Sequence, residues 1–195
     1  MEISIDNELK RKGVHLCALI IPLAYYFFLS KPHALLIFTP IALISILVDV
    51  IRLKQSPSSR WICWILGPIL RERESWDFTG SSYILSAFVL AVLFFNKKIA
   101  VAVICFAILG DLAAALIGRI FGKVKIVNSK KTLEGSLALF GSCVLVILVI
   151  PSFPIWIGLV GALIATVVEA LSIPINDNFS VPLLSGLVME ILWIL

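Results

Sequence analysis

An acidic residue inside an apolar stretch is the first feature of this sequence that could do chemistry. Asp111 belongs to the segment GDLAAALIGRIFGK at 110–123, which is otherwise small and apolar up to Arg119. Ionisable side chains are costly inside a bilayer and are retained there mainly for function. A carboxylate at that depth needs a cationic partner or a bound metal ion, so Asp111 is a candidate functional residue. An ion pair that only locks two helices together is the alternative.

Basic residues follow Asp111 and extend to the next apolar run: Arg119, Lys123, Lys125, Lys130 and Lys131. Lys130, Lys131 and Thr132 directly precede the apolar run 133–150. Free amide groups at a helix N-terminus, together with two ammonium groups, make an anion site suited to phosphate. A topology signal that contacts anionic lipid headgroups is the other interpretation of these cations.

Further carboxylates lie near the ends of apolar runs on the same predicted side, at Glu134, Glu169 and Asp177. Carboxylates beside cations suit Mg²⁺ bound to a polyphosphate, because Mg²⁺ takes one or two carboxylates plus phosphate oxygens. We therefore predict a Mg²⁺ site at Asp111, with Glu134 and Asp177 as further candidate ligands. Neither a P-loop nor a GxGxxG pattern is present.

These residues must be positioned by membrane helices. Hydrophobic residues make up 61% of the 195 residues and charged residues only 14%, which predicts an all-α polytopic membrane protein. Seven apolar runs predict about seven transmembrane helices, and they cover 14–29, 34–51, 78–95, 99–121, 133–150, 154–173 and 181–195. The short apolar segment 61–70 contains Gly67-Pro68 and is predicted to be an interfacial or re-entrant helix, with a shortened span as the alternative.

The basic residues are distributed unevenly between alternate loops. Of the 16 Lys and Arg, only Lys31, Lys97 and Lys98 fall on one side, and the rest fall on the other. The positive-inside rule then predicts a cytoplasmic N-terminus, a C-terminus outside and all the candidate chemistry on the cytoplasmic face. A single crossing by 61–70 would invert everything that follows it.

Five motifs resemble, in order, the CTP-dependent lipid-alcohol kinases, which include polyprenol/dolichol kinase, phytol kinase and the CTP-dependent diacylglycerol kinase. They are RKGVH at 11–15, FTGSSY at 78–83, GDLAAALIGRIFGK at 110–123, SKKTLEG at 129–135 and EALSIPINDNFSVPL at 169–183. The two central motifs are also similar to phosphatidate cytidylyltransferases. The last motif, with Glu169, Asp177 and Asn178, resembles the kinases, and the match is strongest to the polyprenol/dolichol branch.

The resemblance implies transfer of the CTP γ-phosphate to a membrane lipid hydroxyl with Mg²⁺ as cofactor. The catalytic residues that it implies are Asp111, Lys131, Glu134, Glu169 and Asp177, with either Asp177 or Glu169 as the base. The implied nucleotide-binding residues are Arg119, Lys123, Lys130, Thr132, Gly118, Gly122, Gly135 and Asn178. The implied lipid or headgroup contacts are Arg11, Lys12, His15, Thr79 and Tyr83.

Residues 1–195 are expected to form a single integral-membrane catalytic domain. Its expected partners are CTP, a membrane lipid alcohol and the bilayer; a homo-oligomer is compatible with the sequence, and no nucleic acid is expected. A CDP-lipid synthase is the alternative enzyme. A small anion transporter is disfavoured because the charges cluster on one face without an evident inverted repeat. The apolar sequence leaves the acceptor open among polyprenol, dolichol, phytol and diacylglycerol.

Overall fold

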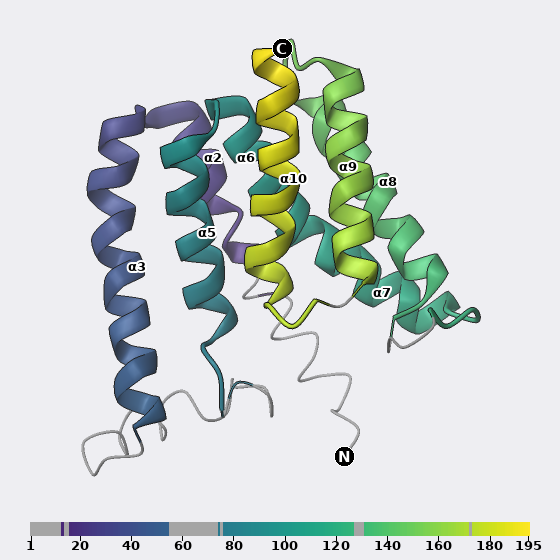
Figure 1. Cartoon of the computed structure of the whole chain (residues 1–195), viewed down its shortest axis with the longest axis horizontal. Coiled ribbons are helices and arrows are strands. Elements are labelled where there is room, and N and C mark those ends of the chain that lie inside the picture. Colours follow the sequence, from purple (N-terminus) through teal and green to yellow (C-terminus); the bar gives the residue numbers. More distant parts are fainter. Residues whose placement is uncertain (1–12, 14–15, 55–73, 75, 127–130, 172) are drawn as a thin grey trace.

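Helices make up nearly all of the chain that the computed structural model describes, namely residues 13, 16–54, 74, 76–126, 131–171 and 173–195 (Figure 1). In that part of the chain, an isolated antiparallel β-bridge joins Lys125 to Thr132 outside the helices. The predictions for Arg11, Lys12, His15, Lys130 and the segment 61–70 lie outside the described residues.

The described helices alternate in direction along the chain (Figure 1). They are α2 (Ile20–Phe28), α3 (Lys31–Leu53), α5 (Gly80–Phe94), α6 (Lys97–Cys105), η3 (Phe106–Gly110), α7 (Asp111–Phe121), α8 (Leu133–Val149), α9 (Ile155–Ala170) and α10 (Asp177–Ile194). Because α6, η3 and α7 run on without a break, these elements amount to seven helices, which confirms the all-helical prediction.

Three of the described helices are long and apolar enough to cross a bilayer: Lys31–Leu53, Lys97–Phe121 and Asp177–Ile194. The helices α5, α8 and α9 are apolar but have only 15, 17 and 16 residues. Large apolar side chains cover the outside of the bundle, as at Leu36, Leu43 and Leu47 of α3, each more than half exposed. Such a surface suits lipid rather than water, and the chain is a membrane protein.

The helix formed by α6 and η3 lies at the centre of the bundle. Every residue from Ile99 to Ile108 is buried, and the helix packs against α2, α5, α8 and α10. The turn η3 is a π-helix of five residues that ends immediately before Asp111. A π-turn adds a residue to the helical repeat and thereby changes the direction of the side chains that follow it. The next segment, α7, runs toward the lower end of α8 (Figure 1).

The two ends of the bundle differ in charge, as the loop pattern predicted. At the end near the C-terminus, the ammonium groups of Lys31, Lys97 and Lys98 donate to the carbonyls of Leu93, Leu29 and Ser152 at 2.8, 2.9 and 3.0 Å. Carbonyls at helix C-termini lack intrahelical partners, and lysine is a favourable donor to them. Arg119, Lys123 and Lys125 lie instead where α7 ends.

The helices on either side of residues 55–73 meet at one end of the bundle. Arg52, in the last turn of α3, donates from Nη1 to the main-chain oxygen of Glu74 at 2.6 Å, and α3 packs along α5. The C-terminal end of α3 and the N-terminal end of α5 therefore lie at the same end of the bundle.

Candidate functional site

Two adjoining pockets lie at the end of the bundle where α7 and α9 finish and α8 and α10 begin. The first has a volume of about 320 Å³ and is lined by small residues of α7 and α8 together with Asp111, Arg119, Lys131, Thr132 and Glu169. The second has a volume of about 140 Å³ and is lined by Glu74, Asp77, Phe78, Asn178 and Asp177, among others. Asp111 and Lys131 line both pockets.

Lys131 joins segments that are far apart in the sequence. Its ammonium group lies 2.7 Å from Asp177 Oδ2 and 3.0 Å from Glu169 Oε1, and it also donates to the main-chain oxygen of Glu169. Glu169 is the more enclosed carboxylate, with 10% of its side chain exposed against 38% for Asp177. The ammonium group therefore ties the start of α8 to the end of α9 and the start of α10.

The floor of the first pocket depends on close packing between α7 and α8. A Cβ atom on Gly135 would lie 2.9 Å from the Ala114 oxygen and 3.3 Å from Gly118 Cα, and one on Gly118 would lie 2.9 Å from Thr132 Oγ1. Only glycine permits the two backbones to approach this closely. Gly118 and Gly135 line the first pocket, whereas Gly122 lines neither pocket and packs on Thr132.

The N-terminus of α8 differs from the prediction of free amide donors. Thr132 is the N-cap, and its hydroxyl accepts from the Gly135 amide at 3.2 Å. The amides of Leu133 and Ser136 donate to the carbonyls of Val124 and Thr132. These amides are therefore already bonded: Leu133 to the chain that folds back from α7, and Gly135 and Ser136 to Thr132. An anion here would be held by the helix dipole and by cationic side chains instead.

Glu134 and Lys123 do not reach either pocket. Both oxygens of Glu134 lie 3.3 Å from the Val124 amide, from which they accept, and Lys123 is exposed in the loop after α7. Within the described part of the chain, no group of three or more acidic, histidine or cysteine side chains is arranged to hold a metal ion. The structure therefore does not assemble a three-carboxylate site from Asp111, Glu134 and Asp177.

The predicted headgroup residues at the start of α5 are bonded to acidic side chains. Thr79 is the N-cap of α5 and donates its hydroxyl to Asp49 Oδ2 at 2.9 Å. The Tyr83 hydroxyl donates to Asp77 Oδ1 at 2.8 Å. Asn178 lines the second pocket and donates to the Gly80 oxygen at 3.4 Å, which joins α10 to α5.

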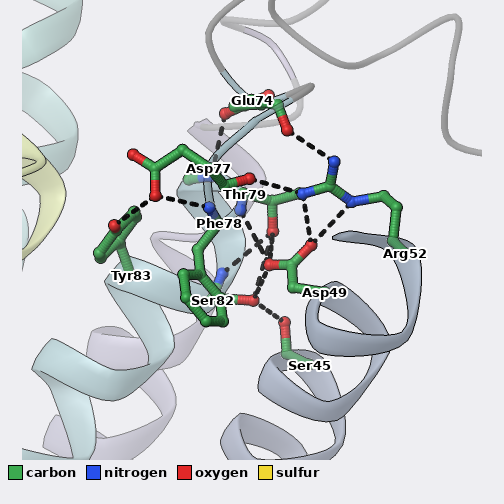
Figure 2. Close-up of polar contacts among 10 residues, drawn as sticks. Ser45, Asp49, Arg52, Glu74, Asp77, Phe78, Thr79, Ser82 and Tyr83 are labelled. Atoms are coloured by element: carbon green, nitrogen blue, oxygen red, sulfur yellow. Dashed lines mark hydrogen bonds and ion pairs between the residues drawn. The ribbon is translucent and has the colours of Figure 1, made fainter. Parts of the chain in front are cut away.

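Sequence reasoning missed four charged residues on this side of the second pocket: Asp49, Arg52, Glu74 and Asp77. Glu74 and Asp77 line the pocket, and Figure 2 shows Asp49 and Arg52 beneath them. Asp49 falls inside the apolar run 34–51, so the criterion that selected Asp111 would also have selected Asp49. Asp77 directly precedes the FTGSSY motif, but nothing in its neighbourhood distinguishes it from a solvated loop residue.

Curated proteins similar to this chain include an uncharacterized protein and two lipid kinases. The uncharacterized protein, from Rickettsia prowazekii (strain Madrid E), is 30% identical over 190 residues, which cover 91% of this chain and 91% of that protein. CTP-dependent diacylglycerol kinase 1 of Eremothecium gossypii is 26% identical over 171 residues, covering 74% of this chain and 54% of the kinase. A probable chloroplastic phytol kinase of Triticum aestivum is 31% identical over 132 residues, covering 58% of this chain and 44% of the kinase.

The chain spans about half the length of these two named kinases. No family model matches it, and no solved structure matches it significantly.

Proposed function

This chain belongs to the CTP-dependent lipid kinase family, and we propose that it transfers the γ-phosphate of CTP to the hydroxyl of a membrane lipid alcohol. The observation that carries the proposal is that Asp111 and Lys131 line both pockets. A group transfer between two substrates needs its charged residues where the two binding sites meet, because the reacting atoms must be held in contact there.

The first pocket has the chemistry of a nucleotide phosphate site. Arg119 and Lys131 supply positive charge, and the dipole of α8 adds to it at Thr132. Its volume of about 320 Å³ lies at the lower end of the range for small-molecule sites, roughly 300 to 1,000 Å³. Phosphoryl transfer depends mainly on positioning and charge neutralisation, which these residues would provide.

The second pocket is assigned to the headgroup of the acceptor. Phe78, Ile173 and Ile175 add apolar surface to its acidic residues. The apolar surface suits the hydrocarbon part of a lipid, and the acidic residues can accept hydrogen bonds from its hydroxyl. Asp177 is the more exposed of the two carboxylates on Lys131 and lines this pocket. We therefore assign Asp177, rather than Glu169, as the acceptor of the hydroxyl proton.

Mg²⁺ fits the donor chemistry of the second pocket. Glu74, Asp77, Asp111 and Asp177 line it. No three acidic side chains in the described part of the chain are arranged around one ion, but Mg²⁺ commonly takes only one or two carboxylates together with substrate phosphates. Asp111 is the proposed ligand because it also lines the first pocket; Asp177 is engaged by Lys131, and Glu134 faces Val124. When bound, the ion would neutralise charge on the β- and γ-phosphates.

In the proposed reaction, the acceptor oxygen forms a bond to the γ-phosphorus while the bond from that phosphorus to the β–γ bridging oxygen breaks. The hydroxyl proton passes to the Asp177 carboxylate, and CDP leaves from the first pocket. Arg119 and Lys131 stabilise the negative charge that develops on the β-phosphate of the departing CDP. We propose that this end of the bundle faces the cytoplasm, where CTP is available, because the basic loops lie there.

Among acceptors we propose a polyprenol, on the resemblance of the motifs to that branch. The named relatives are a diacylglycerol kinase and a phytol kinase, so the decisive assay offers all three alcohols. Purified protein in detergent is incubated with Mg²⁺ and CTP labelled on the γ-phosphate, together with polyprenol, phytol, diacylglycerol or phosphatidate. Label in polyprenyl phosphate supports the proposal, and label in another alcohol changes the acceptor. A CDP-lipid with labelled pyrophosphate would instead make the protein a cytidylyltransferase.

A further inference from the structure

A buried ion pair in α3 contacts the chain just before α5 (Figure 2), where Glu74, Asp77 and Phe78 line the second pocket. Asp49 is 1% exposed and Arg52 is 3% exposed. Arg52 donates from Nε and Nη2 to Asp49 Oδ1, at 3.1 and 3.0 Å. Removing two charges from solvent is costly, and a buried pair is by itself weak evidence for a stabilising role. The function of the pair is therefore argued from the other hydrogen bonds that Asp49 and Arg52 make.

Those contacts run to the loop between α3 and α5. Arg52 Nη1 and Nη2 donate to the main-chain oxygens of Glu74 and Asp77, both at 2.6 Å. Asp49 Oδ2 accepts from the Thr79 amide at 2.8 Å, from the Thr79 hydroxyl at 2.9 Å and from the Ser82 hydroxyl at 2.6 Å. The pair thus bonds to the main chain of Glu74, Asp77 and Thr79, which lie close together in the sequence just before α5.

The same loop presents side chains to the second pocket. Glu74, Asp77 and Phe78 all line it. The Asp77 carboxylate is oriented further by the Phe78 amide and the Tyr83 hydroxyl, which donate to its Oδ1 at 2.7 and 2.8 Å. The main chain of the loop is therefore bonded to Asp49 and Arg52 of α3, while its acidic and aromatic side chains line the pocket.

We infer that Asp49 and Arg52 are positioning residues for the second pocket, where they fix the wall that receives the acceptor headgroup. The naming of that occupant rests on the proposed function; the positioning of the loop does not. A guanidinium group is suited to this task because its planar fork can donate to several acceptors in fixed directions, which a lysine ammonium group cannot reproduce.

A paired substitution separates positioning from stability. Arg52→Met alone leaves Asp49 buried and unpaired, so the melting temperature should fall. Asp49→Leu with Arg52→Met removes both charges at similar volume, which is often neutral for stability, so the melting temperature should return toward that of the wild type. Arg52→Lys keeps the charge and provides a second folded variant if the double variant does not recover.

Two readouts on these variants test the inference. Hydrogen exchange of the peptide covering 76–83 should lose protection in the double variant, because the Thr79 amide loses Asp49 and the loop carbonyls lose Arg52. Arg52→Lys should lose less protection, because Asp49 remains and only the guanidinium bonds to the loop carbonyls are lost. In the same variants the KM for the acceptor should rise about 10- to 100-fold, since displacing a substrate-positioning group by an ångström has effects of this size. The KM for CTP should change less than twofold, since neither residue lines the first pocket.

Glu190→Gln is the matched control. The Glu190 carboxylate accepts from the main-chain amide of Asn96 at 2.7 Å, at the opposite end of the bundle. Loss of its charge should therefore leave both readouts as in the wild type. Wild-type exchange together with a wild-type acceptor KM in a stable double variant would overturn the inference. If the wild type phosphorylates no lipid alcohol, the proposed function fails, and the exchange result alone still decides whether the pair positions the loop.

Discussion

Among the described residues, Lys131 is one of two, with Asp111, that line both pockets. Its ammonium group is shared between Glu169 and Asp177. A phosphate group in the first pocket would compete with these carboxylates for the same cation, because charge-assisted bonds to either are of similar strength. Nucleotide binding would then loosen Asp177 from Lys131, and this is when the proposed base is needed.

Asp111→Asn should reduce phosphate transfer by about 100-fold or more, the scale observed when one group that stabilises charge in a transition state is removed. The amide keeps the shape of the side chain but is a poor ligand for Mg²⁺. Transfer of γ-label from CTP is measured alongside the melting temperature, with Glu190→Gln as an acid-to-amide control remote from the site. Near wild-type turnover in a folded Asp111→Asn protein would contradict the proposed role.

Lys131→Ala should raise the KM for CTP by about tenfold or more, since a charge-assisted contact is worth roughly 1.5 to 3 kcal/mol. It should also lower the melting temperature, because Glu169 is buried and would lose its cation. Lys131→Arg keeps the charge and should recover stability more fully than activity. Steady-state kinetics with varied CTP provides the measurement, and an unchanged KM for CTP in Lys131→Ala would count against a phosphate contact.

At the scale of elements, the π-turn η3 and the glycine contact between α7 and α8 shape the first pocket. The π-turn ends one residue before Asp111, and π-turns inside longer helices are frequent at functional sites. The glycines then let α7 lie against α8 beside Thr132. Neither feature contributes a charged group, yet both determine where the charged groups lie.

Gly135→Ala should destabilise the protein by about 1 to 3 kcal/mol, the usual cost of overpacking, and should impair CTP use. The added Cβ would lie 2.9 Å from a backbone oxygen of α7, which cannot move aside like a flexible side chain. Gly141→Ala is the control in the same helix, since a Cβ there meets nothing within 4 Å; it should be neutral or stabilise by up to about 1 kcal/mol. Thermal unfolding in detergent compares the two. Equal melting temperatures would argue against the close contact.

At the scale of the whole molecule, the site occupies one end of the bundle and the lysines that bond to carbonyls occupy the other. Lys31, Lys97 and Lys98 are engaged by main-chain oxygens, whereas Arg119 and Lys131 line a pocket. The charge asymmetry in the sequence thus corresponds to two chemically different ends. One end is suited to anchoring helices, and the other is suited to binding an anion.

Cysteine labelling tests which end faces the cytoplasm. With Cys17 and Cys63 replaced by serine and the buried Cys105 and Cys143 retained, Lys125→Cys and Ser152→Cys place single exposed thiols at opposite ends. A membrane-impermeant maleimide should label position 152 in intact cells and position 125 only after permeabilisation, if the basic end is cytoplasmic. Labelling in the reverse order would place the site on the outer face.

Much of the architecture was predictable because it depends on local properties. Apolar runs of sufficient length determine where helices form in a membrane, and an acid within such a run stands out, so the helices and Asp111 were identified directly. The same criterion would have identified Asp49, which was overlooked. Glu134 was placed in the metal site because it is an acid beside cations; its direction depends on the loop that folds over α8, and sequence proximity carried no information about that.

The sequence by itself determined the helical membrane architecture, the charge asymmetry between the two ends of the bundle and the candidate residues Asp111, Lys131 and Asp177. Hydropathy and charge are properties of the individual residues, so they are known before the fold is. Only the tertiary structure decided which of these residues meet. Lys131 bonds to Glu169 and Asp177, 38 and 46 positions away in the chain. Asp49 accepts from the amide of Thr79, 30 positions away. Such pairings depend on how the helices pack, since a buried charge takes whichever partner the packing brings within hydrogen-bond distance.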